Sequence, residues 1–217
     1  MDRGAAFRSG GSEKRAPALA FLGLAGLALM MWPAFRAPVV TWSDSAIDLA
    51  WAREGVGLVK PPAASPDVVV GHPPKAAYLL FLAVAMRIVP AVGEAQSVVI
   101  VQSLLLWLSI AGTSLYVARR RGAAAGVVAY ALVLAILRLR DCASAVMPEA
   151  FAATLFLPIA ALILDPPTRL SGCLALGGAT AVLFFVRPNL AALAGVTTVV
   201  SLALELRPRD AALFALA

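Results

Sequence analysis

Charged residues are scarce in this sequence. Asp, Glu, Lys and Arg make up 14% of its 217 residues, whereas 61% are hydrophobic, and the mean hydropathy is +0.89. A soluble domain averages about 25% charged and roughly 45–50% apolar residues. Because so few charged residues are available to cover a water-soluble core, we expect the chain to use lipid as part of its solvent.

Cysteine and histidine are also rare. Cys142 and Cys173 lie far apart without a CxxC pair, and His72 is the single histidine. This pattern excludes a disulfide framework and argues against a zinc site. We expect both cysteines to be small apolar residues in the packing and predict no metal site. A divalent metal as cofactor stays an open alternative without a clear ligand set.

The net charge of +6 does not indicate nucleic-acid binding, because no basic stripe with interleaved aromatic residues is present. In a membrane protein, Lys and Arg concentrate in cytoplasmic loops. Residues 1–16 are basic, and the apolar run after them lacks a small-residue cleavage site. The sequence therefore predicts an uncleaved first span and a cytoplasmic N-terminus at 1–16.

Six apolar stretches are long enough to cross, or nearly cross, a membrane. They cover residues 17–35, 96–117, 122–137, 149–164, 170–186 and 189–204, and a further span begins at 211–217. Residues 17–217 are therefore predicted to form an all-α, polytopic transmembrane helix bundle. Because the last apolar run is too short for a span, we expect the chain to be the N-terminal part of a longer protein.

A seventh apolar stretch, Ala76–Val89, is interrupted by Arg87 and followed by Pro90. An apolar run of about 10–14 residues is typical of an interfacial or re-entrant segment. If this stretch does not span, Arg119–Arg121 lie on the same side as the basic N-terminus, as the Lys/Arg bias of cytoplasmic loops favours. Residues 36–95 then form a long outer loop with juxtamembrane helices.

Three acids lie at predicted outer boundaries of the membrane. Asp44 is suited to cap a helix that begins near Ser45, and Asp48 lies one turn later on the same face, either in solvent or beside a cation. Glu149, directly after Pro148, suits the first turn of a helix electrostatically. Because ionisable groups at membrane depth usually mark a site, each acid has a structural and a functional interpretation.

Two arginines near the same face also have two interpretations. Arg187 lies between two apolar runs with almost no loop. It is either an interface residue whose charge reaches water or a clamp for a phosphate, which a guanidinium fork binds well. Arg138 is either an ordinary headgroup contact or a substrate contact.

The order of several short motifs resembles that of the GT-C-type membrane glycosyltransferases, which include protein O-mannosyltransferases and lipid A aminoarabinose transferases. The matching segments run through almost the whole chain: Trp42-Ser43-Asp44-Ser45, Ala50–Gly55, Gly71-His72-Pro73-Pro74 with Tyr78-Leu79-Leu80, Tyr116–Arg121, Met147–Phe151, and Val186-Arg187-Pro188-Asn189. Each motif alone is short, and their shared order carries the resemblance. It implies the N-terminal module of such an enzyme.

The resemblance also implies roles for individual residues. Asp44 would be the catalytic base that deprotonates the acceptor, and Glu149 the second catalytic acid. Arg187 and Lys75 would contact the phosphate of a polyprenyl-phosphate sugar donor, because negative charge grows on that leaving group. Three further residues are assigned to substrate binding: Asp48, His72 and Arg138. The acceptor, whether protein, lipid or glycan, stays unnamed.

This chain departs from the family pattern in two places. Ser45 stands where the family often has a second acid, which argues against a metal-binding acid pair at Asp44. Asp48 stands where an aromatic residue is usual. The resemblance implies an inverting sugar transfer at the outer face of a bacterial inner membrane, although the fragment alone is expected to be inactive. A transporter or flippase-like protein and a non-catalytic cell-envelope assembly protein remain the alternatives.

Overall fold

The computed structural model describes residues 15–36, 43–55, 75–136, 145–164 and 170–204, and these residues are helical or lie in short connections. They contain no strand, so the predicted all-α class is confirmed. The helices are α1 (Arg15–Arg36), α2 (Ser43–Glu54), α3 (Ala76–Ala85), the 3-10 turn η2 (Pro90–Val92), α4 (Glu94–Arg121), α5 (Ala123–Leu134), α7 (Pro148–Leu164), α8 (Leu170–Phe184) and α9 (Pro188–Leu204).

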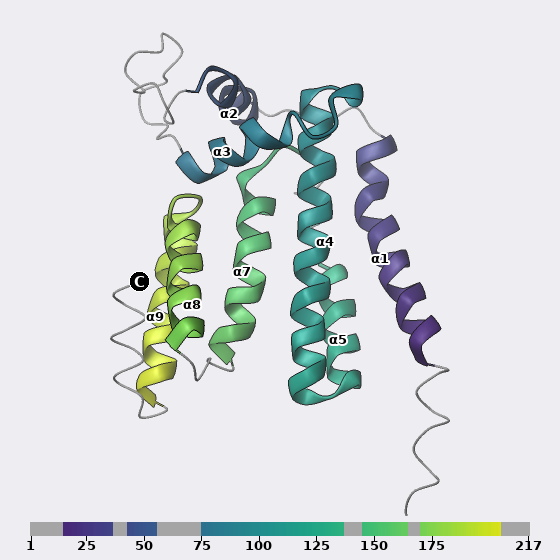
Figure 1. The fold of residues 1–217 in the computed structure, drawn as a ribbon, viewed down its shortest axis with the longest axis vertical. Coiled ribbons are helices and arrows are strands. Elements are labelled where there is room, and N and C mark those ends of the chain that lie inside the picture. Colours follow the sequence, from purple (N-terminus) through teal and green to yellow (C-terminus); the bar gives the residue numbers. More distant parts are fainter. Residues whose placement is uncertain (1–14, 37–42, 56–74, 137–144, 165–169, 205–217) are drawn as a thin grey trace, which may run out of the picture.

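The long helices form a bundle around α4 (Figure 1). Helix α4 packs against α1, α5 and α7, and α7 packs in turn against α8 and α9. The short helices α2 and α3 lie across one end of this bundle. The amino ends of α4, α7 and α9 are at that end, which we call the capped end, and α4 finishes at the opposite, basic end.

Hydrogen bonds from small polar side chains join the long helices. Ser109 Oγ on α4 donates to the Thr154 carbonyl oxygen on α7 at 2.7 Å, and Ser201 Oγ on α9 donates to the Ile163 carbonyl oxygen at 3.3 Å. Packing and such interhelical hydrogen bonds hold helices together where lipid replaces water as the solvent.

The connection between α3 and α4 is fixed by Ser97. Its Oγ accepts a hydrogen bond from the Val89 N–H at 3.0 Å and donates one to the Ala85 carbonyl oxygen at 2.5 Å. Gly93 adopts φ 87° at the start of α4, a conformation that glycine reaches without a steric penalty. The chain can therefore turn from α3, which lies across the bundle, into α4, which runs along it.

The sequence-derived helix boundaries differ from the structure mainly at α3 and α5. The stretch Ala76–Val89 is helical only as far as Ala85, because the chain turns before Pro90. Helix α5 ends at Leu134 and has 12 residues, whereas the apolar pattern predicts a span to residue 137. The pattern misses this end because the residues that follow Leu134 are also apolar.

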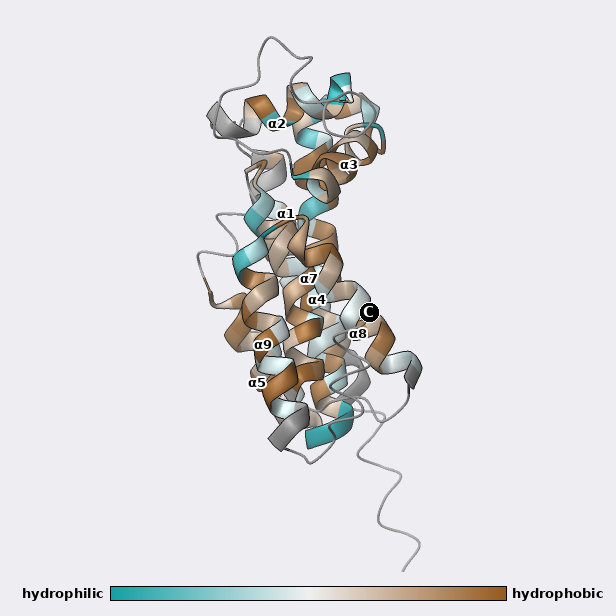
Figure 2. Ribbon diagram, turned by 90° about the vertical axis from the view of Figure 1, so that its left-hand side faces the viewer, coloured by the Kyte–Doolittle hydropathy of each residue, from teal (hydrophilic) through white to brown (hydrophobic). Residues whose placement is uncertain are grey.

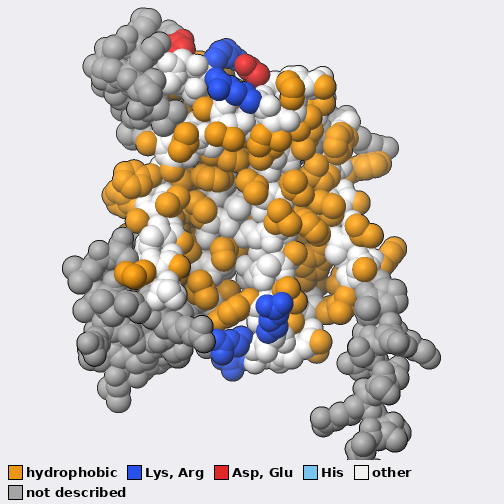
Figure 3. Space-filling model, in the orientation of Figure 1, with side chains coloured by type: hydrophobic (Ala, Val, Ile, Leu, Met, Phe, Trp, Pro, Cys, Tyr) orange, Lys and Arg blue, Asp and Glu red, His pale blue; other side chains and the backbone are white. Residues whose placement is uncertain are grey.

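By length and composition, one helix of the described residues, Glu94–Arg121, is suited to cross a membrane. The shorter apolar helical segments of the described residues have 10–17 residues. On the face drawn in Figure 3, hydrophobic side chains are spread over the surface between the two ends of the bundle, and the Lys and Arg side chains lie at the ends. Figure 2 shows the same separation along the ribbon, with hydrophilic residues concentrated around α2.

Helix α1 docks onto the bundle where glycine lets Tyr130 of α5 approach closely. The Tyr130 hydroxyl donates to the Gly23 carbonyl oxygen at 3.3 Å and accepts a hydrogen bond from Trp107 Nε1 at 2.9 Å. A Cβ atom on Gly26 would overlap the Tyr130 hydroxyl, whereas a Cβ atom on Gly23 would meet nothing within 4 Å.

Replacement of these two glycines by alanine should therefore affect the unfolding free energy differently. Gly26→Ala forces Tyr130 away and lowers the unfolding free energy by about 1–3 kcal/mol, as overpacking typically does. Gly23→Ala is the matched control and leaves stability unchanged or slightly raised, since alanine favours a helix over glycine. Thermal unfolding of both variants in detergent measures the difference, and equal unfolding temperatures would contradict the close α1–α5 contact.

Candidate functional site at the capped end

Four elements bring charged and aromatic side chains together at the capped end. These are α2, the start of α3, the first turn of α7, and the connection between α8 and α9. Apolar residues of these elements share one buried cluster, to which α2 contributes Trp51, α3 contributes Leu79 and the connection between α8 and α9 contributes Val186. The charged residues of this end are thus held by a common core.

Asp48 lies within this core and pairs with Lys75. The Asp48 side chain is only 1% exposed, and Lys75 Nζ lies 3.4 Å from its Oδ2. Lys75 is 19% exposed and immediately precedes α3. The interpretation of Asp48 as part of a solvated helix face is therefore wrong. Packing of α2 on α3 removes the carboxylate from water, and the lysine supplies the cation that such burial requires.

Glu149 and Arg187 form a second ion pair, between Oε1 and Nη2. Glu149 occupies the first turn of α7, and Arg187 directly precedes α9, which begins at Pro188. The side chains are 43% and 33% exposed, respectively. The two residues that the sequence assigns separately to catalysis and phosphate binding are thus direct partners, and both remain accessible.

Stacked aromatic rings connect α3 with α7 at the capped end. The Phe81 and Phe151 ring centroids are 4.4 Å apart, and Tyr78 lies 6.1 Å from each of them. Aromatic pairs at such distances contribute beyond the area that they bury. Tyr78 follows Lys75 by one helical turn and Phe151 follows Glu149 by two residues, so this stack links the segments that carry the two pairs.

Tyr78 is fully buried, and its hydroxyl has no hydrogen-bond partner among the described residues. Burial raises the pKa of the Tyr78 phenol well above its ordinary value, and the charge of Asp48 acts in the same direction. The phenol therefore keeps its proton at neutral pH and can donate a hydrogen bond. The sequence motif contains Tyr78, but nothing in the pattern distinguishes it from a core aromatic residue.

Asp44 is the second residue of α2, because the helix begins at Ser43. The expected cap position before a helix from Ser45 is therefore wrong, and Asp44 lies inside the first turn. Residues four apart on a helix are neighbours, so its backbone is one turn from the buried Asp48. The Asp44 side chain lies outside the described residues, as do His72 and Arg138.

A third ion pair, Arg53–Glu94, joins the end of α2 to the start of α4 at the surface. Its hydrogen bond to Glu94 raises the pKa of the Arg53 guanidinium, so the arginine stays charged. The described residues hold no group of three or more His, Cys, Asp or Glu side chains that could bind a metal. Among the described residues, the cationic side chains at this end are those of lysine and arginine.

Comparisons with known protein families, with curated proteins and with solved structures find no match. A buried carboxylate–ammonium pair and an accessible carboxylate–guanidinium pair can bind an anionic group and orient a proton acceptor. Neutral hydrogen-bond donors and acceptors alone would bind a phosphate less strongly.

The Asp48–Lys75 pair is predicted to hold α2 on α3. Lys75→Met leaves a buried carboxylate without its cation and should lower the unfolding free energy by about 3–5 kcal/mol. Asp48→Leu combined with Lys75→Met should recover most of this loss, since it removes both charges. Arg53→Ala at the exposed pair is the control and should cost less than about 1 kcal/mol. An unchanged unfolding free energy in Lys75→Met would contradict the burial of Asp48.

Tyr78→Phe should not lower the unfolding temperature at neutral pH, because it removes a buried hydroxyl that lacks a partner. In the wild type, the raised folded-state pKa contributes stability that is complete below pH about 10 and is lost as the pH rises above it. The phenylalanine variant should lack this alkaline loss. Tyr130→Phe is the control and should destabilise by about 1 kcal/mol, since that hydroxyl makes two hydrogen bonds.

Proposed function

We propose that the chain is part of a polytopic membrane glycosyltransferase. The enzyme would transfer a sugar, with inversion, from a polyprenyl-phosphate donor to an acceptor at the outer face of a bacterial inner membrane. The observation that carries this proposal is that the Asp48–Lys75 and Glu149–Arg187 pairs lie at the same end of the bundle as the turn that carries Asp44.

A membrane location is supported by the distribution of exposed side chains. Large hydrophobic residues are exposed on the helices of the bundle, for example Phe21 at 74%, Leu132 at 64% and Val196 at 64%. In water, contiguous apolar surface of this kind would drive association. Lipid covers such surface without cost, and the charged ends would then lie at the two interfaces (Figure 3).

The proposed reaction assigns a role to each charged group. The Asp44 carboxylate accepts the proton of the acceptor hydroxyl or amine, whose oxygen or nitrogen forms a bond to the anomeric carbon. The bond from that carbon to the phosphate oxygen breaks on the opposite side, and the polyprenyl phosphate leaves with the electron pair. Arg187 and Lys75 compensate the charge that develops on this phosphate.

Glu149 and Asp48, the acidic partners of these cations, hold them in place. Glu149 holds Arg187 at the amino end of α9, while the guanidinium retains further N–H donors for a phosphate. Asp48 holds Lys75 at the start of α3. Asp48 is too deeply buried to contact an acceptor directly, so in this proposal it is a positioning residue for the lysine.

Replacement of Asp44 by asparagine tests the catalytic base. In the full-length protein, Asp44→Asn should lower the rate of sugar transfer by about 10²–10⁴-fold, as loss of general-base catalysis typically does. Glu54→Gln, at the other end of the same helix, is the control and should leave the rate unchanged. Consumption of undecaprenyl-phosphate-linked hexoses and pentoses in membranes measures the effect. Full transfer by Asp44→Asn would exclude the role of Asp44.

A further inference from the structure

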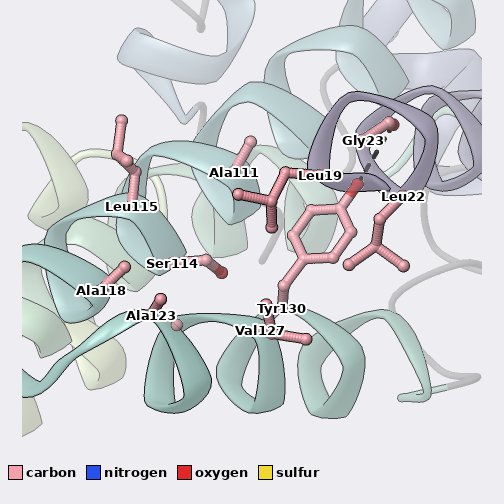
Figure 4. Close-up of a pocket in the computed structure, with 11 residues that line it drawn as sticks. Leu19, Leu22, Gly23, Ala111, Ser114, Leu115, Ala118, Ala123, Val127 and Tyr130 are labelled. Atoms are coloured by element: carbon pink, nitrogen blue, oxygen red, sulfur yellow. Dashed lines mark hydrogen bonds between the residues drawn. The ribbon is translucent and has the colours of Figure 1, made fainter. Parts of the chain in front are cut away.

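A groove with almost entirely apolar walls opens between α1, α4 and α5 (Figure 4). Its lining residues belong to the half of the bundle away from the capped end (Figure 1). The groove has a volume of about 220 Å³. Its lining residues are Leu19, Leu22, Gly23, Ala111, Ser114, Leu115, Ala118, Ala123, Gly126, Val127 and Tyr130. Leucine and valine side chains thus face a groove that no described side chain fills.

Close packing of α4 on α5 makes the groove a fixed feature. A Cβ atom on Gly126 would overlap Ala118 Cβ and would lie 2.8 Å from the Ser114 carbonyl oxygen. The two helices therefore approach as closely as glycine permits. The hydroxyl of Tyr130 at the far side is already hydrogen bonded to Gly23, so this residue presents mainly its ring to the groove.

Basic side chains follow directly after the groove. Helix α4 continues from Ala118 into Arg119, Arg120 and Arg121, all of them exposed. The Arg120 guanidinium lies over the Tyr116 ring at 5.7 Å. Arg120 thus packs on the face of α4 away from the groove-lining Ala118, and the three arginines together place positive charge at the end of α4 beyond the groove. The headgroup of a lipid with its chain in the groove would lie near this end.

We propose that this groove binds one acyl chain of an anionic glycerophospholipid whose phosphate is held by Arg119–Arg121. The inference rests on the membrane location proposed above and not on the transferase activity. Basic pockets between transmembrane helices on the cytoplasmic side bind anionic headgroups by the same physics. With 28 residues, α4 is about 40 Å long, so this site is far from the capped end and distinct from the proposed donor site.

Charge and polarity favour this occupant over others. A peptide would bring backbone N–H and C=O groups that the apolar walls cannot satisfy. A zwitterionic lipid could fill the groove but would gain less from three arginines. The polyprenyl-phosphate donor also combines an apolar chain with a phosphate, and the test must therefore distinguish it from the phospholipid.

The test measures lipid binding to the purified chain in detergent by native mass spectrometry. The probes are phosphatidylglycerol and phosphatidylcholine with identical acyl chains, and undecaprenyl phosphate. The wild type should bind phosphatidylglycerol most tightly. Replacement of Arg119, Arg120 and Arg121 by alanine should weaken that binding about tenfold to a hundredfold, because each basic residue near an anionic headgroup contributes several-fold.

Three further variants make the result specific. Replacement of the same three arginines by lysine should retain most of the binding, since it keeps the charge. Val127→Trp should fill the groove and weaken the binding of both phospholipids, whereas undecaprenyl phosphate bound at the proposed donor site should be unaffected. Arg53→Ala with Arg87→Ala removes two basic residues near the capped end and should change nothing. Circular dichroism and elution as a single species show that each variant is folded.

Equal affinity for phosphatidylglycerol and phosphatidylcholine would overturn the proposal, and so would tighter binding of undecaprenyl phosphate at this groove. Unchanged binding in the triple alanine variant would do the same. The transferase proposal fails by a different result, full sugar transfer by Asp44→Asn. Asp44→Asn should leave phosphatidylglycerol binding at its wild-type level, so the two failures can be told apart.

Discussion

The arrangement of the capped end depends on the burial of the Asp48 carboxylate beside Lys75. A carboxylate at 1% exposure is stable only next to a cation or a set of hydrogen-bond donors, and this requirement ties α2 to the start of α3. The aromatic stack of Tyr78, Phe81 and Phe151 then ties α3 to α7. The ion pair thus holds α3 in place, and the aromatic stack in turn positions the first turn of α7. That turn carries Glu149, the partner of Arg187.

The second constraint is the shortage of charge. A chain with 14% charged residues cannot cover its bundle with charged side chains, and many large hydrophobic side chains are exposed between the ends, as the face in Figure 3 shows. The Asp, Glu, Lys and Arg residues that the structure describes lie at the ends, where water or headgroups can solvate them. A proposed active site at one end and a proposed lipid site at the other are consistent with this separation, because both sites need charge beside an apolar surface.

The apolar periodicity predicted most helices to within a few residues, including α7 and α9, since long apolar runs bounded by Pro or charge are unambiguous. It also placed Asp48 and Glu149 near the same end. The pairing of each acid with a particular cation was not predictable, because Lys75 and Arg187 are 27 and 38 positions away in sequence and only packing brings them near. The early end of α5 was missed because no polar residue marks it.

The measurement that tests this account most directly is cysteine labelling from outside intact cells. Cys142 and Cys173 are first replaced by alanine, and a single cysteine is then introduced at Ala91, exposed near the capped end, or at Ala123, exposed at the basic end. A membrane-impermeant maleimide should label Ala91→Cys in intact cells and Ala123→Cys only after permeabilisation. Labelling of both cysteines from the same side, or of neither after permeabilisation, would contradict a membrane-spanning bundle with its charged site outside.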